Sequence, residues 1–381
     1  MDERVLAERL MAYDTSRPEG LRAAAEFVKG WLETRDLDVR GHDHAGLPVV
    51  LAEAGPAAGP VVVLHGHLDV VPAFEEQFTP RVEGDRLYGR GAYDMKGALA
   101  AMMCALQDAT RQNAVRVLFV CVPDEEAEDI DDRSTDALVA GGLGADFAIT
   151  GEPTDLHIGV EAKGVLALRL EVRGTAAHGS TPWLGDNAIL KAHDIFRRIE
   201  TLPFSRESSD LFDRPSINLA RISGGDVFNK VPDRCSIDVD IRYLPGQEPA
   251  AILEQIATIP DLELVRSFQR QPATVSRRNP YVLALREAVA RSIEGEALSI
   301  GRDGASDAIS FLEAGIPAVE FGPVGAGHHG PREWVSVASL RRYRQALGDF
   351  VANLPSWLEH TGPESGGRGR ADDPPPLRAV E

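Results

Sequence analysis

The chain has 381 residues, of which 43% are hydrophobic and 26% are charged, and its formal net charge is −19. This composition is ordinary for a soluble globular protein, and the length accommodates two domains. The negative charge argues against nucleic acids and anionic membranes as main partners, because both reward a basic surface. We expect most of the acidic side chains to be solvated, and part of them to surround a bound cation.

The three cysteines lie far apart in the sequence, and no Cys-x-x-Cys pair occurs. This spacing argues against a disulfide framework and against a thiolate zinc site. Cys104 and Cys121 stand in apolar segments, so we expect core residues rather than nucleophiles. The N-terminus lacks the apolar segment of a signal peptide, and no apolar run reaches the length of a membrane span. We therefore expect a cytoplasmic protein.

The first part of the chain alternates between predicted helices and short apolar strands. The periodicity predicts helices over 3–13, 19–35 and 94–112, and strands over 37–42, 47–53, 60–65, 115–122 and 146–150. A hairpin is expected over 82–89, turning at Gly84-Asp85. This alternation predicts an α/β domain with a mostly parallel central sheet flanked by helices.

The pattern changes at about Lys163. Residues 165–172 and 236–243 alternate between apolar and polar side chains, as half-exposed antiparallel strands do, and helices are expected near 186–200 and 247–259. The α/β pattern then returns with helices over 280–293, 306–314 and 336–354 and a strand over 317–321. We therefore predict a catalytic domain of residues 1–162 and 276–360 interrupted by an α+β insert of residues 163–275. The glycine- and proline-rich tail, residues 361–381, is predicted to be disordered.

Side chains that commonly bind metals follow several of the predicted strands. They are His67 and Asp69, Asp94, Glu125 and Glu126, Glu152, and the pair His328-His329. In open α/β sheets, ligands bind beyond the carboxyl ends of the strands. We therefore expect these loops to converge at one edge of the sheet and to form a metal site.

The charge of the expected cluster indicates two metal ions. The three carboxylates of Asp94, Glu126 and Glu152, with neutral His67 and His329, sum to −3, and such like charges oppose one another's ionisation. Two divalent ions and a bridging hydroxide would bring the sum to zero. Imidazole with carboxylate suits Zn²⁺, and Co²⁺ or Mn²⁺ could substitute. Glu125 is then a spare carboxylate that could carry a proton.

Each of these residues also has an ordinary structural interpretation. Asp94 could cap the following helix, and Glu125 and Glu126 could belong to a solvated acidic loop, because four more acidic residues follow by position 132. Glu152 could simply form a turn before Pro153, and both histidines could be exposed. If the chain had no metal site, all of these structural explanations would have to be true at once. This requirement favours the metal site. The Gly-x-Gly-x-x-Gly match at 325–330 lacks a following βαβ unit, so we expect no dinucleotide site.

Seven motifs in this chain occur in the order of a known family. They are His65–Pro72, Gly89–Gly97, Asp124–Glu126, Gly151–Pro153, Gly174–Ile189, Asn229–Asp233 and His329–Glu333. Over roughly residues 10–355, the sequence resembles the M20 metallopeptidases. That group includes acetylornithine deacetylase, succinyl-diaminopimelate desuccinylase, aminoacylases and related carboxypeptidases.

The resemblance implies a di-zinc centre. In it, His67, Asp94 and Glu152 would hold one zinc ion, and Glu126 and His329 the other, with Asp94 bridging the two. His329 is preferred to the neighbouring histidine because its spacing to the last motif residue fits.

The resemblance also implies which residue orients a metal ligand and which residue transfers the proton during hydrolysis. Asp69 would orient His67, and Glu125 would act as general base and general acid. The Asp94–Met95 peptide bond would be cis.

The resemblance makes the insert a dimerisation domain and assigns three residues in it. His178 would reach the active site of the partner in a homodimer and steady the oxyanion, and Asn229 and Arg242 would bind the substrate carboxylate. Without the resemblance, His178 and Arg242 would be taken for polar surface residues. Two segments depart from the family pattern: Gly304–Ile309 lacks the usual Thr and Arg, and 127–133 is unusually acidic. Either could alter substrate specificity.

We therefore interpret the chain as a di-zinc amidohydrolase that cleaves N-acyl amino acids, as acetylornithine deacetylase and succinyl-diaminopimelate desuccinylase do. The alternative within the family is a dipeptidase or carboxypeptidase that acts on small peptides. The alternative from another class is a catalytically silent, metal-dependent binding protein. The intact Glu125 disfavours the binding protein, which would not need a spare base.

Overall fold

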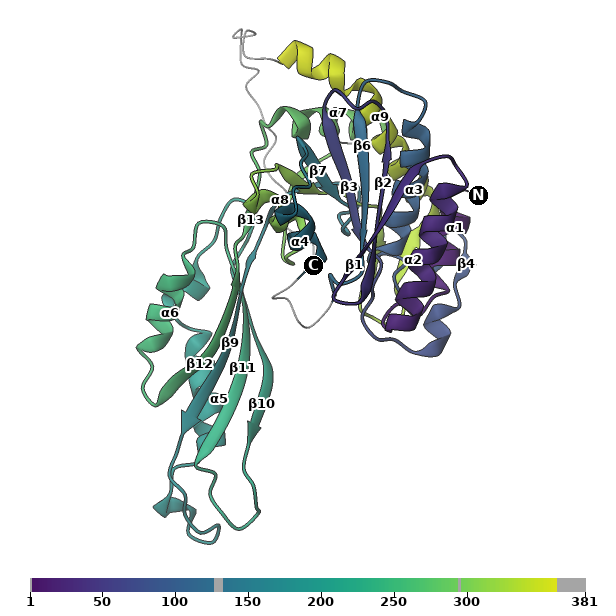
Figure 1. Cartoon of the computed structure of the whole chain (residues 1–381). Helices are drawn as coiled ribbons and strands as arrows, with labels where there is room; N and C mark the ends of the chain where they lie inside the picture. Colours follow the sequence, from purple (N-terminus) through teal and green to yellow (C-terminus); the bar gives the residue numbers. More distant parts are fainter. Residues whose placement is uncertain (1, 127–132, 294–295, 362–381) are drawn as a thin grey trace. The chain divides into compact units, whose positions relative to one another are not determined.

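The structure is a computed structural model that describes residues 2–126, 133–293 and 296–361 (Figure 1). Within these residues the chain forms two compact units. The first unit contains the described residues of 2–160, 275–299 and 306–361, and the second contains 161–274 and 300–305. The second unit is therefore inserted in the sequence of the first.

A mixed β-sheet forms the middle of the first unit. Its central strands β6, β3, β7 and β15 run parallel in that order, and antiparallel strands extend the sheet on both sides. The parallel strands are apolar on both faces because helices cover both faces. The bounds are β1 Asp38–His44, β2 Leu47–Ala54, β3 Val61–His67, β6 Arg116–Val122, β7 Phe147–Thr150, β8 Ile158–Ala162 and β15 Ala318–Glu320.

Helices pack on both faces of this sheet (Figure 1). On one face, Phe147 stacks against Tyr281 of α7 with ring centroids 5.3 Å apart and lies 6.0 Å from Phe350 of α9. On the other face, Phe311 of α8 packs with Val63 and its neighbours in the sheet. The bounds are α1 Glu3–Met11, α2 Pro18–Glu33, α3 Lys96–Ala109, α4 Ser134–Ala140, α7 Pro280–Ser292, α8 Ala308–Glu313 and α9 Val337–Thr361.

A second, small antiparallel sheet in the first unit joins segments that are far apart in the sequence. Its strands lie in the order β16, β17, β5 and β4. The pairing of Trp334 with Tyr88 holds the loop that precedes α3 beside the loop between β16 and β17. The bounds are β4 Arg81–Glu83, β5 Arg86–Tyr88, β16 Gly325–Ala326 and β17 Trp334–Ser336, and the short 3-10 helix η1 spans Glu75–Phe78.

The second unit is an antiparallel sheet with helices on one face. Its strands lie in the order β10, β11, β9 and β12, and alternate side chains of β9 and β11 pack against α5 and α6. The bounds are β9 Gly164–Arg173, α5 Ala188–Ile199, β10 Ser216–Gly224, β11 Arg234–Tyr243, α6 Pro249–Ala257 and β12 Leu262–Arg270. Shorter elements are η2 Pro182–Leu184, η3 Pro203–Arg206, β13 Ala273–Thr274 and β14 Ser299–Arg302.

The predicted α/β class is confirmed, with parallel strands at the centre of the sheet. The sequence analysis missed β8, β10, β12 and α4, and also the short strands β13, β14, β16 and β17. Strands β10 and β12 are the edges of their sheet, and most of their side chains are exposed, so they lack the apolar alternation of a half-buried strand. The helix predicted over 94–112 is shorter and spans Lys96–Ala109. The predicted disorder of the tail lies outside the described residues.

Among the described residues, no helix combines the length and the apolar character that crossing a membrane requires.

Candidate metal centre and active site

Three parallel strands bring their loops to the same edge of the central sheet. Strand β3 ends at His67, β6 ends at Val122 just before Glu126, and β7 ends at Thr150 just before Glu152. Because these strands are neighbours and parallel, their carboxyl ends meet, which is where open α/β sheets bind ligands. The convergence expected from the sequence is therefore present for these loops.

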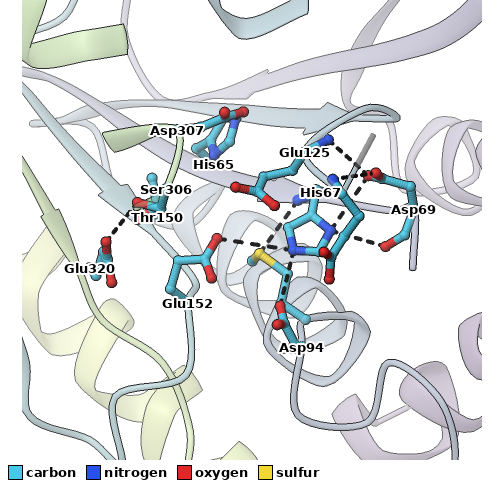
Figure 2. Close-up of polar contacts among 12 residues, drawn as sticks. His65, His67, Asp69, Asp94, Glu125, Thr150, Glu152, Ser306, Asp307 and Glu320 are labelled. Atoms are coloured by element: carbon cyan, nitrogen blue, oxygen red, sulfur yellow. Dashed lines mark hydrogen bonds and ion pairs between the residues drawn. The ribbon is translucent and has the colours of Figure 1, made fainter. Parts of the chain in front are cut away.

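His67 is buried and lies among carboxylates (Figure 2). Its Nε2 atom is 3.1 Å from Oδ1 of Asp94 and 4.0 Å from Oε1 of Glu152. Its Nδ1 atom is 3.0 Å from the backbone oxygen of Asp69 and 3.5 Å from the carboxylate of the same residue. The backbone contact of Nδ1 leaves Nε2 as the nitrogen that faces Asp94 and Glu152.

Asp94 lies between two imidazoles. Its Oδ1 atom faces His67, and its Oδ2 atom is 3.4 Å from Nε2 of His329. That same nitrogen of His329 is 2.8 Å from Oε1 of Glu126. The two oxygens of one carboxylate therefore face two separate groups of ligand-type atoms, which is the arrangement of a bridging ligand.

The residues present fit a metal ion. Ligand atoms of His67, Asp94 and Glu126 all lie within 4.8 Å of one another. Zinc–ligand bonds of about 2.0–2.2 Å in a tetrahedron separate the ligand atoms by about 3.4 Å. The measured separations of 3.1 Å and 3.4 Å at Asp94 match this spacing. Imidazole nitrogen and carboxylate oxygen are also the donors that zinc accepts.

Asp94 and the two histidines on either side of it shift one another's pKa values. Burial opposes charge on His67, but the carboxylates of Asp69 and Asp94 outweigh it and hold the pKa of His67 well above its usual value. Hydrogen bonds with Asp94 and Glu126 raise the pKa of His329 to about 10. Burial likewise opposes charge on Asp94, yet the two histidines hold its pKa well below the usual range. The protons on these two histidines therefore supply the positive charge that the neighbouring carboxylates would otherwise need from metal cations.

Glu125 lies beside this cluster and is held by its backbone and its side chain. The backbone N–H groups of Glu125 and Glu126 donate to the Asp69 carboxylate at 3.2 Å and 2.7 Å. The side chain accepts a hydrogen bond from Arg133 at 3.1 Å. Burial raises the pKa of Glu125 to about 8, against the opposing effect of Arg133. A carboxyl group that titrates near neutrality is suited to proton transfer.

Buried Glu333 joins the loops that carry Asp94 and His329. Its carboxylate pairs with Arg90 at 2.7 Å, and Arg90 also donates to the backbone oxygen of His329 at 3.1 Å. The same carboxylate accepts three backbone N–H groups at 2.9–3.0 Å, those of Gly91, Tyr93 and Asp94. One ion pair therefore fixes two loops whose residues are more than 200 positions apart.

The geometry also bears on the ordinary structural interpretations. Asp94 does not cap α3, whose N-cap is Met95 without a side-chain cap, and the Asp94–Met95 peptide bond is cis. His329 contacts the acidic cluster, whereas the ring of His328 lies 5.9 Å from the ring of Tyr93. Asp94 and His329 therefore point into the cluster.

His178, Asn229 and Arg242 belong to the second unit, where the segments of His178 and Asn229 are joined by backbone contacts and Arg242 lies apart from both. The backbone of His178 forms an isolated β-bridge with the backbone of Lys230. Lys230 directly follows Asn229 and lies near the start of β11. Arg242 lies eight residues after the first residue of that strand, Arg234, and donates to Asp240 at 3.0 Å. At about 3.3 Å per residue, the start of β11 and Arg242 are about 26 Å apart.

Sequence reasoning assigned no role to several residues that support the cluster. They are His65, Arg90, Arg133, Thr135, Asp307 and Glu333. Arg90, His65 and Glu333 stand inside quoted motifs, which was the available signal. The signal for Arg133 is weaker: it is the first basic residue after a run of acids, directly before a helix.

Comparison with known proteins adds to this geometry. The sequence pattern of peptidase family M20/M25/M40 matches residues 63–353. The chain is 32% identical to an acetylornithine deacetylase of Myxococcus xanthus, over 91% of this chain and 92% of that one. It is 29% identical to a succinyl-diaminopimelate desuccinylase of Erythrobacter litoralis, over 81% and 84% of the two chains.

Solved structures show the same fold. An M20 family metallo-carboxypeptidase of Sulfolobus solfataricus superposes with a TM-score of 0.77 at 21% identity, covering 93% of this chain and 100% of that one. A tripeptidase of Staphylococcus aureus gives a TM-score of 0.75 at 21% identity, with 92% and 97% covered.

Fold, site and relatives together define a hydrolase of the metal-dependent peptidase and amidohydrolase class. The chain belongs to peptidase family M20/M25/M40, as its sequence resemblance indicated.

Proposed function

We propose that this protein is a di-zinc amidohydrolase that cleaves the amide bond of N-acyl amino acids. The observation that carries the proposal is the position of Asp94, whose two oxygens face His67 and His329 with Glu125 alongside. Glu152 would complete the ligand set at His67, and Glu126 would complete the set at His329. The relatives named as deacetylase and desuccinylase support an N-acyl amino acid as the substrate.

The chemistry follows from the positions of the side chains. When bound, two divalent cations would lower the pKa of a water molecule and polarise the substrate carbonyl. Glu125 accepts the proton of that water and later delivers it to the leaving amine. The hydrogen bonds from the two backbone N–H groups to Asp69 keep the Glu125 turn beside His67 throughout.

The substrate-binding part of the proposal requires two chains. Arg242 and Asn229 would bind the substrate carboxylate, and His178 would donate a hydrogen bond to the oxyanion. Within one chain, Asn229 and His178 lie about 26 Å from Arg242, farther than one amino-acid substrate spans. We therefore propose a homodimer in which the second unit supplies His178 and Asn229 to the partner.

The test is hydrolysis of a substrate panel by zinc- and cobalt-loaded protein, with chelated protein as a control. The panel contains N-acetylornithine, N-succinyl-diaminopimelate, other N-acyl amino acids, dipeptides and tripeptides. We expect chelator-sensitive release of the acyl group, with the highest kcat/KM on an N-acyl amino acid. A preference for peptides would support the peptidase alternative instead. Binding without turnover at full metal loading would support the binding protein and contradict the proposal.

A further inference from the structure

A buried ion-pair network lies behind Glu125, on the side away from the backbone contacts with Asp69. One nitrogen of Arg133, Nη1, donates to Oε1 of Glu125 at 3.1 Å and to Oδ1 of Asp307 at 2.9 Å. All three side chains are largely buried, with exposed fractions of 12% for Arg133, 13% for Glu125 and 1% for Asp307. Arg133 therefore bridges two carboxylates that come from different loops.

The far end of this network is anchored in the protein core. The second oxygen of Asp307 lies 3.4 Å from Nε2 of His65 and accepts a hydrogen bond from Thr135. The ring of His65 packs edge-on against Phe311, with centroids 5.4 Å apart. Figure 2 shows His65 and Asp307 side by side, above and to the left of the cluster around His67. Contacts with His65 and Thr135 therefore hold Asp307 in place, and the ion pair with Asp307 holds Arg133.

The start of α4 is tied to the Glu125 turn by a separate contact. Asp124 accepts the backbone N–H of Ser134 at 2.8 Å and also the hydroxyl of that residue. This contact places the backbone next to Arg133 close to the turn that carries Glu125. From this backbone position the Arg133 side chain reaches both Glu125 and Asp307.

We propose that Arg133 is a positioning residue that holds the Glu125 carboxylate in the orientation required for proton transfer. The proposal rests on the proposed role of Glu125. A buried ion pair is weak support for stability, because removing charges from water costs about as much as their attraction returns. Its contact with Glu125, a carboxylate outside the proposed ligand set, indicates positioning instead. A misplacement of about 1 Å at a reacting group can cost about 100-fold in rate.

The test compares R133Q and R133K with the same replacements at Arg344. Arg344 is a matched control, because it also bridges two carboxylates in the first unit, those of Glu3 and Asp108. Neither of these acids belongs to a ligand-bearing loop. For each variant, kcat, KM, metal content and Tm are measured on the best substrate of the panel.

We expect R133Q to lower kcat by about 100-fold and to leave KM within about twofold, with unchanged metal content. R133K should recover part of kcat, because one ammonium group can still bridge the two carboxylates. R344Q and R344K should lower Tm without changing kcat. Equal kcat in R133Q and the unchanged protein would overturn the proposal. A rise in KM alone would overturn it too, because it would assign Arg133 to substrate binding.

A crystal structure of R133Q separates this proposal from the proposed function. We expect the Glu125 carboxylate to leave its position while the contacts of His67 and Asp94 stay unchanged. A Glu125 carboxylate that keeps its position without Arg133 would refute the positioning role. If the unchanged protein hydrolyses nothing on the panel, the proposed function fails, but the crystal structure still decides whether Arg133 orients Glu125. If R133Q does not fold, R133M replaces it in both measurements, because it also removes the charge that bridges Glu125 and Asp307.

Discussion

The two units distribute their candidate functional residues in opposite ways. In the first unit, four loops bring His67, Asp94, Glu126 and His329 within hydrogen-bonding distance inside one chain, and Glu152 of a fifth loop lies 4.0 Å from His67. In the second unit, His178 and Arg242 occupy opposite ends of one sheet. The proposed metal ligands therefore lie together in one chain, whereas the proposed substrate-binding residues of one second unit do not, which is why we proposed a homodimer.

The largest expected effect concerns Glu125, beside the proposed metal ligands of the first unit. Glu125→Ala should lower kcat by about 1,000-fold, because general base and acid catalysis contributes about 100- to 10,000-fold. Metal content, measured by atomic absorption, should stay unchanged. Glu313→Ala, at an exposed position of α8, is the control and should keep full activity. Full activity of Glu125→Ala would contradict the proposed mechanism.

The next largest effect concerns His178 of the second unit. His178→Ala should lower kcat by about 100-fold, because one oxyanion donor is worth about that much. Co-expression of His178→Ala with Glu125→Ala should restore about a quarter of the activity, because half of the dimers are mixed and each mixed dimer has one intact site.

A matched pairing sharpens this test. Co-expression of Arg242→Ala with Glu125→Ala should not restore the KM of the unchanged protein. We propose that Arg242 serves the site of its own chain, so no site of a mixed dimer would contain both Arg242 and Glu125. Restoration in this pairing, or its failure with His178→Ala, would reverse the proposed assignment of residues to chains.

The effect on substrate affinity should be smaller. Arg242→Ala should raise KM by about 10- to 100-fold, because a hydrogen bond to a charged group contributes about 1.5–3 kcal/mol. The variant should no longer discriminate against a substrate whose carboxyl group is amidated. Arg221→Ala, at an exposed position of β10, is the control. An unchanged KM for Arg242→Ala would assign the substrate carboxylate to another cation.

The smallest effect per step of the experiment is a pH dependence of metal affinity, at about tenfold per pH unit. Without metal, His329 has a pKa raised to about 10 by Asp94 and Glu126, so it is protonated at neutral pH. Metal binding must displace this proton, so affinity should rise as pH increases. We expect about tenfold tighter binding per pH unit for each proton released between pH 6 and pH 8. Competition with a chelator measures this slope, and a zero slope would exclude His329 as a ligand.

Much of the first unit could be predicted because its signals are local. The strands β3 and β6 are continuous apolar runs, and the ligand-type residues directly follow such runs. The parallel order of the strands, which periodicity does not specify, turns these separate loops into one cluster.

The supporting network could not be predicted for a physical reason. Arg133 and Asp307 are 174 positions apart, and neither residue type at its position indicates a partner. Strands β10 and β12 were missed because edge strands bury few side chains. The sequence reasoning therefore succeeded where burial leaves a pattern and failed where contacts between distant residues determine the structure.

The ion pair of Glu333 with Arg90 has a consequence for how the metal centre assembles. Because it fixes the loops of Asp94 and His329 within the folded chain, the entropy of bringing these two proposed ligands together is lost during folding, before any ion would bind. A site formed in advance selects among cations by size and coordination geometry instead of adapting to each of them. The chelated protein should therefore keep its fold and take up metal again without refolding.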